Sequence, residues 1–143
     1  MNISWCYDQS KTNWSELSEL YKIAPLGIKL PADLKVVFTN SRFKCFAFDG
    51  DTLVGVGRAL ADGLDCSYIC DIAIHPEYQG MGLGVQVVQY LIEQSRGHKK
   101  IILYANPGKE RFYSKHGFKK MNTAMAIFRN EEEMINNGTL SEK

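Results

Sequence analysis

The sequence predicts an α/β (α+β) fold, a mixed, mostly antiparallel central sheet of six to seven strands flanked by about four helices. Three short apolar segments follow one another with turn residues between them, which is typical of an antiparallel meander. An apolar strand, an amphipathic helix and a further apolar strand overlap the end of that meander, which adds a parallel pair with helices on the faces of the sheet. Because 143 residues suit one core, we expect a single domain over residues 1–143.

The chain is expected to open with a strand and two helices. Residues 1–7 alternate polar and apolar side chains, which indicates a strand. Apolar residues recur at helical spacing in residues 14–23, and Asn13 or Thr12 precedes them as a capping residue. A second, short helix is expected over residues 31–40, because a proline at its first position suits a helix start.

Three strands are expected next, at residues 43–48, 53–61 and 66–75. The turn Asp49-Gly50-Asp51 joins the first two, and an Asp-Gly pair is a strong hairpin signal. The turn at Asp62-Gly63 leads to the third strand, whose isoleucines indicate burial on both faces.

The last part of the chain alternates helices and strands, so the whole order is β-α-α-β-β-β-α-β-α-β with one further strand. The first helix here is amphipathic, and Gly97 follows it as a C-terminal cap. These elements are expected at residues 85–95 (helix), 100–104 (strand), 109–115 (helix), 118–121 and 124–128 (strands), with a polar tail at 130–143.

Composition and charge exclude several classes of function. Lys plus Arg number 17 and Asp plus Glu number 16, so the large basic excess of a general nucleic-acid binder is absent. Neither a secretory signal nor a membrane-spanning apolar run is present, which predicts a cytoplasmic protein without a membrane partner. The four cysteines match no zinc spacing, so we expect reduced, packed thiols and no metal.

The segment that carries chemistry runs from Cys70 to Gly84. An apolar strand ends at His75-Pro76, and alternating glycines then lead into a helix. Glycines let a ligand approach the backbone, and the first turn of a helix offers unpaired N–H groups and the positive end of a dipole. A phosphate or pyrophosphate is therefore expected at this turn. The spacing fails both G-x-G-x-x-G and the Walker sequence G-x-x-x-x-G-K-[ST].

Two motifs resemble those of the GNAT (GCN5-related N-acetyltransferase) superfamily. Gln79-Gly80-Met81-Gly82-Leu83-Gly84 matches its pyrophosphate motif Q/R-x-x-G-x-G/A. Phe112-Tyr113 followed by Gly117-Phe118 matches its signature Phe-Tyr-x-x-x-Gly-Phe, although Glu110-Arg111 replaces the usual small residues. The resemblance implies a small single-domain GNAT member with acetyl-CoA as cosubstrate, bound by a core at residues 43–128. Residues 1–42 would then shape the acceptor side.

The resemblance also implies roles for individual residues. Tyr113 would donate a proton to the departing thiolate, or else be a core aromatic residue. Asp71 would accept the proton of the amine, with Glu77 a weaker alternative, or else be an ordinary strand-end aspartate. His75 is expected to be a strand-end histidine, and a covalent acyl-cysteine is disfavoured. The residues expected to contact acetyl-CoA are Ile72, Ala73, Ile74, Gln79, Gly80, Met81, Gly82, Leu83, Gly84, Val85, Asn106, Phe112 and Tyr113.

The expected activity is transfer of the acetyl group of acetyl-CoA to a primary amine of a small molecule. Arg58 and Tyr68 lie on the strands that would flank the cleft. Two other readings stay open: a non-catalytic acyl-CoA-binding regulator on the same fold, and an unrelated nucleotide-binding module. A homodimer is a family expectation.

Overall fold

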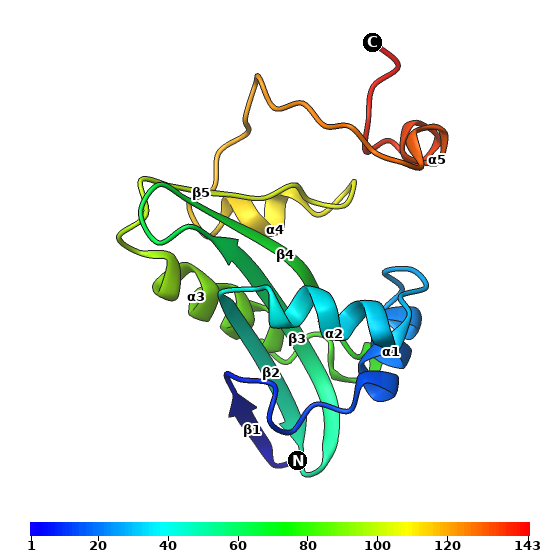
Figure 1. Ribbon diagram of the computed structural model, residues 1–143, viewed down its shortest axis with the longest axis vertical. Coiled ribbons are helices and arrows are strands. Elements are labelled where there is room, and N and C mark those ends of the chain that lie inside the picture. The colour runs from blue at the N-terminus through cyan, green and yellow to red at the C-terminus, as the bar shows by residue number, and fades with distance from the viewer. The chain divides into compact units, whose positions relative to one another are not determined.

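The computed structural model describes all residues from Met1 to Lys143 and divides into two compact units, Met1–Leu103 and Tyr104–Lys143. Each unit is described by itself. The first contains β1 (Ile3–Cys6), α1 (Trp14–Ile23), α2 (Pro31–Thr39), β2 (Phe43–Asp49), β3 (Thr52–Ala61), β4 (Cys66–Ile74), the 3₁₀ turn η1 (Pro76–Tyr78), α3 (Leu83–Ser95) and β5 (Lys100–Ile102) (Figure 1). The second contains α4 (Glu110–Ser114) and α5 (Glu131–Asn136).

The first unit is built on a five-stranded sheet in the order β1-β2-β3-β4-β5. The first three pairings are antiparallel, and β4 pairs with β5 in parallel. A parallel pair needs a crossover connection, and α3 supplies it. The mixed, mostly antiparallel sheet expected from the sequence is therefore present.

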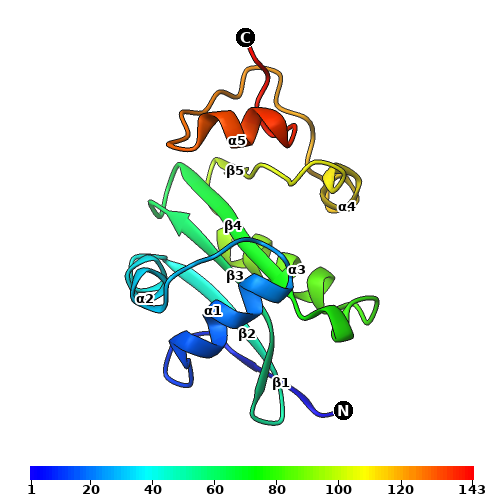
Figure 2. The same ribbon diagram turned by 90° about the vertical axis from the view of Figure 1, so that its right-hand side faces the viewer.

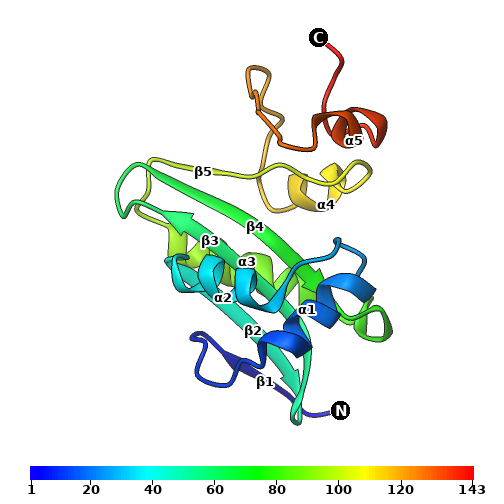
Figure 3. The same cartoon turned by 45° about the vertical axis from the view of Figure 1, so that its right-hand side comes forward.

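Helices cover both faces of this sheet, with α1 and α2 on one side and α3 on the other (Figure 2). On the α3 side, Gly57 lets the helix approach closely, because a Cβ there would lie 2.6 Å from Val87 Cγ1 and 3.0 Å from Leu91 Cδ1. Figure 3 shows α1 and α2 together on one side of the sheet, and α1 contacts β3 and β4. The sheet is thus a middle layer between two helical layers.

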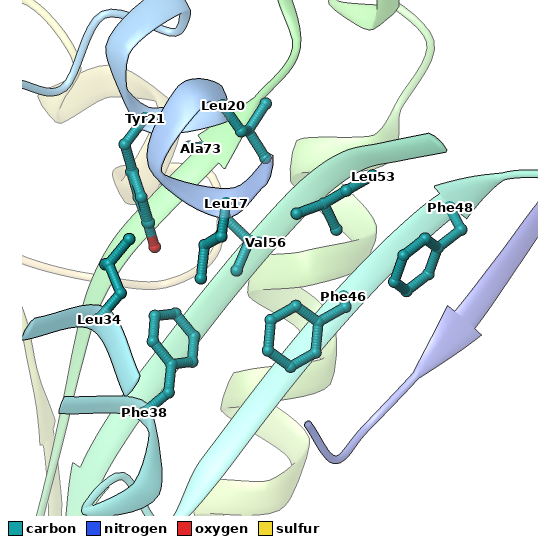
Figure 4. Close-up of a cluster of buried hydrophobic side chains, with 10 residues drawn as sticks. All are labelled: Leu17, Leu20, Tyr21, Leu34, Phe38, Phe46, Phe48, Leu53, Val56 and Ala73. Carbon is teal, nitrogen blue, oxygen red and sulfur yellow. The ribbon is translucent and has the colours of Figure 1, made fainter. Parts of the chain in front are cut away.

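The larger core cluster fills the space between the sheet and the α1–α2 pair (Figure 4). Its centre is aromatic, since the Phe38 and Phe46 rings lie 5.5 Å apart and both are fully buried. Such pairs add to the free energy gained from burial alone. The cluster consists of Leu17, Leu20, Tyr21, Leu34, Phe38, Phe46, Phe48, Leu53, Val56 and Ala73.

Local signals in the sequence account for the helix ends. The Asn13 side chain accepts a hydrogen bond from the N–H of Glu16, so the prediction of Asn13 as an N-cap is confirmed. Pro31 is the first residue of α2, as expected. Gly97 follows α3 with φ +98°, a conformation that favours glycine. None of the α-helices combines the length and the hydrophobicity that a membrane span requires.

Several predicted elements are wrong or shorter than expected. The sheet has five strands instead of six to seven, and there are five α-helices instead of about four. Residues 118–121 and 124–128 form no strands, and the Met125 and Ile127 side chains are almost fully exposed. Alternation of apolar residues favours a strand, but a stable strand also needs a partner to pair with. The strand expected at 100–104 ends at Ile102, and the polar tail contains α5.

β4 is also less deeply buried than its isoleucines suggested. Ser67, Ile69 and Ala73 are buried, while Ile72 and Ile74 are only partly covered. A strand with helices on both faces and a full partner on each edge is buried throughout. The incomplete burial of β4 follows from its short pairing with β5.

Candidate active site

The segment that contains Gly80 and Gly82 forms a turn immediately before α3, and the space beside its backbone is open. Gly80 and Gly82 have φ values of +81° and +82°, which residues with a Cβ rarely adopt. A Cβ built on either would meet nothing within 4 Å, so the space beside the backbone is free. The turn therefore combines a conformation specific to glycine with room for a ligand.

The first turn of α3 leaves N–H groups without partners in the helix. The first helical hydrogen bond runs from Gln86 N–H to Gly82 C=O, so the N–H groups of Leu83, Gly84 and Val85 precede the ladder. Gly82 provides no side-chain cap, and no acidic residue lies in the first turn. These donors and the helix dipole suit an anion such as a pyrophosphate.

β4 has an edge that no strand covers. Its pairing with β5 ends at Tyr68 and Ile102, so the remaining residues of β4 have a strand partner only on the β3 side. An uncovered edge presents backbone N–H and C=O groups that another extended chain can bind.

The groups on this edge belong to Ile72 and Ile74. The N–H of His75 donates to the carbonyl of Val54 on β3. Because successive residues of a strand direct their backbone groups to opposite edges, those of Ala73 also face β3. The backbone of Ile72 and Ile74 then faces the open edge. Of the three strand residues expected to bind by their backbone, two are so placed.

β4 is bulged at its centre. Asp71 and Ile72 together stand opposite Gly57, because the register shifts between Val56 and Arg58. Asp71 has φ +56° and is the one non-glycine residue with a positive φ. The bulge turns its side chain toward the sheet face that carries Arg58, whereas Ile72 lies against the α3 side.

Two side chains, Tyr21 and Arg58, hold Asp71 in this conformation, and Ser41 in turn bonds to Arg58. The hydroxyl of Tyr21 donates to the backbone carbonyl of Asp71 over 2.7 Å. Arg58 Nε donates to Asp71 Oδ2 over 2.8 Å, and Arg58 Nη1 donates to Ser41 Oγ over 3.2 Å. Burial raises the pKa of Tyr21 well above its ordinary value, so the hydroxyl keeps its proton and acts as the donor.

A pocket of about 240 Å³ opens beside Asp71, on the face that carries α1 and α2. Its charged residues come from the α1–α2 connection, the first turn of α2, and the strands β3 and β4. Its apolar residues come from the same connection and from α2. The lining consists of Ile28, Lys29, Asp33, Leu34, Val37, Arg58 and Asp71.

The residues that precede the glycine turn have structural partners. His75 Nδ1 accepts from the N–H of Glu77 and so caps the 3₁₀ turn, which confirms a strand-end histidine. The side-chain amide of Gln79 lies 3.4 Å from the carbonyl of Ile74 and donates to it, which ties the turn to the open edge of β4. Glu77 itself is exposed.

Cys45 and Cys70 are not activated nucleophiles. Burial raises the pKa of Cys70 to about 11 and that of Cys45 to about 12, so both thiols are protonated at neutral pH. All four cysteines are free thiols. No group of three or more His, Cys, Asp or Glu side chains is placed to hold a metal ion.

The other expected site residues belong to the second unit. Tyr113 is partly buried on α4, where its ring packs edge-on against Phe112 and Phe118. Burial raises its pKa above the ordinary value of 10, so the phenol keeps its proton at neutral pH. Asn106 is exposed, and its carbonyl accepts from the N–H of Lys109.

Two residues near Asp71 were missed by sequence reasoning. Tyr21 reads as an ordinary apolar position of an amphipathic helix, and Lys29 lies in a loop without a motif. Nothing in the sequence signals a hydrogen bond from Tyr21 to a residue 50 positions away.

Comparison with known proteins agrees with this geometry. A profile of the acetyltransferase (GNAT) family matches residues 8–118. An uncharacterized N-acetyltransferase ycf52-like protein of Prochlorococcus marinus is 33% identical over 91 residues, which is 59% of this chain and 51% of that protein. The chloroplastic serotonin N-acetyltransferase 2 of rice is 34% identical over 88 residues, 58% of this chain and 44% of the relative. The chain thus spans about half the length of these relatives.

Solved structures share the fold. A probable acetyltransferase of Staphylococcus aureus superposes with a TM-score of 0.78 at 22% identity, covering 88% of this chain and 97% of the other. A predicted acetyltransferase of Clostridium acetobutylicum, solved with acetyl-CoA, gives 0.67 at 16% identity and covers 90% and 97%. At these identities the likeness concerns the fold.

Proposed function

The chain belongs to the acetyltransferase (GNAT) family, and we propose that it transfers the acetyl group of acetyl-CoA to the primary amine of a small molecule. One observation carries the proposal: an uncovered strand edge at Ile72 and Ile74 runs into a glycine turn and the open end of α3. The edge suits an extended amide-containing arm, and the helix end suits a pyrophosphate.

The residues present fit acetyl-CoA. The free space beside Gly80 and Gly82 and the unpaired donors of the first turn of α3 suit its pyrophosphate, with Met81 in the same turn and Gln79 leading into it. The open edge of Ile72 and Ile74 suits its pantetheine arm. When bound, acetyl-CoA supplies an activated thioester. Asn106 and Phe112 are proposed contacts from the second unit.

The bulge supplies the chemistry at the reacting centre. The N–H of Ile72 faces the open edge and is proposed to polarise the carbonyl under attack, as an oxyanion-hole donor does. Asp71 Oδ1 is proposed to accept the proton of the amine, because Oδ2 already accepts from Arg58 while Oδ1 has only a 3.6 Å contact with Lys29. Glu77 is the alternative base.

Tyr113 is proposed to return a proton to the leaving sulfur. Its raised pKa ensures that the phenol is protonated when the thiolate departs. The proton is thus removed from the amine at Asp71 and restored at Tyr113, and no covalent enzyme intermediate is required. The protonated thiol of Cys70 is consistent with direct transfer.

Two observations favour a small acceptor. The pocket beside Asp71 holds about 240 Å³, below the about 300–1,000 Å³ of sites for drug-sized ligands, which suits a compact amine. One relative is named as an acetyltransferase of serotonin, a compact aromatic amine.

Turnover of acetyl-CoA, followed as released thiol, against a panel of primary amines tests the proposal. We predict turnover with a subset of small amines and a kcat at least about 100-fold lower for Tyr113→Phe. Tyr90→Phe is the matched control, because it removes a phenol from α3 whose ring stacks on Tyr7 away from the pocket. It is expected to leave kcat unchanged.

Other results of these binding and turnover measurements would favour one of the two alternative functions or remove Tyr113 as the acid. Binding of acetyl-CoA without turnover on any amine would favour a non-catalytic acyl-CoA-binding regulator. Binding of ATP or NAD by a protein that does not bind acetyl-CoA would favour an unrelated nucleotide-binding module. Equal activity of Tyr113→Phe and wild type would remove Tyr113 as the acid. A homodimer and a cytoplasmic location stay predictions.

A further inference from the structure

The ammonium group of Lys29 lies inside the pocket beside Asp71. Its Nζ is 3.6 Å from Asp71 Oδ1 and 5.4 Å from the centroid of the Tyr21 ring. A carboxylate and the face of an aromatic ring together form a favourable environment for an ammonium ion. The chain's own cation therefore occupies a position suited to an amine.

The contact of Lys29 with Asp71 is the weaker of two. Arg58 donates to Oδ2 over 2.8 Å, within hydrogen-bond range, whereas the Lys29 contact is longer than a hydrogen bond. About a third of the Lys29 side chain is exposed, and partly solvated pairs contribute at most about 1 kcal/mol. Lys29 can leave Oδ1 at little cost, while Arg58 keeps Asp71 in place.

The backbone of Lys29 is held independently of its side chain. Ser18 Oγ donates to the carbonyl of Lys29 over 2.5 Å, which fixes the α1–α2 connection to α1. The side chain can therefore swing out without displacement of the loop that forms the pocket wall.

The charges that line the pocket indicate which ligand would replace the Lys29 ammonium group. The pocket is lined by two acidic residues, Asp33 and Asp71, and two basic residues, Lys29 and Arg58, so it is neutral as it stands. With Lys29 swung out, the lining carries one net negative charge. The other lining side chains are apolar, namely Ile28, Leu34 and Val37.

We propose that Lys29 is a specificity-determining residue that fills, in the free protein, the ammonium position of an acceptor subsite for compact monocationic amines with an apolar body. The proposal rests on the proposed function for the identity of the acceptor. Ligand binding displaces the Lys29 ammonium from Asp71 Oδ1, and the apolar body of the ligand lies against Ile28, Leu34 and Val37.

Binding of three probes that share one ring tests the subsite. 2-Phenylethylamine is a monocation, 2-phenylethanol is neutral and 3-phenylpropionate is an anion. Their affinities are measured by titration calorimetry on wild type and Lys29→Met, with and without coenzyme A. Lys29→Met keeps an unbranched side chain but removes the competing charge. We expect it to tighten 2-phenylethylamine about two- to fivefold, the strength of the pair that it removes.

The controls separate this effect from a general change of charge. Lys35→Met removes the same charge from α2 at a residue that does not line the pocket, and should leave every affinity unchanged. Lys29→Arg keeps a cation in the pocket and should not tighten the amine. The neutral and anionic probes should bind more weakly than the amine to Lys29→Met.

Two results of the affinity measurements would overturn the proposal. If Lys29 instead recognised an anionic group of the acceptor, Lys29→Met would weaken binding of 3-phenylpropionate and leave the amine unaffected. Absence of amine binding to both proteins would also overturn it. The measured quantity is binding and needs no acetyl transfer. Tighter binding of 2-phenylethylamine to Lys29→Met, together with no turnover on any amine of the panel, would therefore support the subsite and refute the proposed enzyme.

Discussion

The hydroxyl of Tyr21 and the carbonyl of Asp71 meet inside the core over 2.7 Å, at the bulge of β4. Asp71 holds a left-handed conformation there, which costs a residue other than glycine about 1 kcal/mol or more. Tyr21 and Arg58 offset this cost with bonds to its backbone and side chain. The direction of the Ile72 N–H therefore depends on a residue of α1.

We predict that Tyr21→Phe lowers kcat about tenfold while the KM for acetyl-CoA changes little. Loss of the hydroxyl leaves a part-buried carbonyl unpaired, which costs about 1–3 kcal/mol of stability, and it lets the bulge relax. A small misplacement of the polarising N–H then slows the chemical step more than binding. Steady-state kinetics and thermal unfolding of the variant check this.

Ser95→Ala is the matched control. Ser95 Oγ bonds Ser67 Oγ of β4 and donates to the carbonyl of Leu91, so the substitution also removes a buried hydroxyl, but away from the bulge. A similar loss of stability with an unchanged kcat is expected. If both variants lose kcat equally, Tyr21 has no positioning role.

At the scale of elements, the packing of α3 on the sheet depends on Gly57. A Cβ there would lie 2.6 Å from Val87 Cγ1, closer than side chains tolerate. We predict that Gly57→Ala destabilises the fold by about 1–3 kcal/mol, because added volume in a packed core forces shifts. Urea unfolding measures the change.

Gly55→Ala serves for comparison on the same strand. Its nearest neighbour would be Ile74 Cδ1 at 3.1 Å, the end of a flexible side chain that can move. A smaller loss of stability is expected. An equal or greater loss would mean that the closeness of α3 is not what requires glycine on β3.

Some elements of the fold could be predicted from the sequence and others could not. The bounds of α1 and the glycine turn were predictable, because a capped apolar period and a spaced motif are local signals. The bulge was not, because Cys70-Asp71-Ile72 reads as ordinary strand until β3 sets the register. The strand predicted at residues 124–128 is absent, because alternating apolar residues indicate a strand but do not show whether a neighbouring strand can pair with it.

The candidate site likewise contains residues that a local motif indicates and residues that only the fold brings together. The glycine turn between Gln79 and Val85 was predictable from spacing, and the structure shows open space and free donors there. Its binding of acetyl-CoA stays a prediction. Tyr21 and Lys29 act through contacts across 50 and 42 residues of sequence to Asp71, and such contacts exist only in the fold. Polar residues far apart in sequence leave no periodic signal.

At the scale of the whole molecule, we propose that one chain binds acetyl-CoA through the open edge of β4 and the start of α3. Titration calorimetry with acetyl-CoA tests it on wild type, Gly82→Val and Gly97→Val. The two glycines flank α3, with φ values of +82° and +98° and free space beside each, so either substitution imposes a similar strain. Only Gly82 lies where the pyrophosphate is proposed to bind.

We predict that wild type binds one acetyl-CoA per chain, that Gly82→Val loses at least about tenfold in affinity, which is about 1.4 kcal/mol, and that Gly97→Val binds like wild type. Absence of binding to wild type would mean that the chain does not bind acetyl-CoA, and equal losses in the two variants would mean that the pyrophosphate does not bind at Gly82.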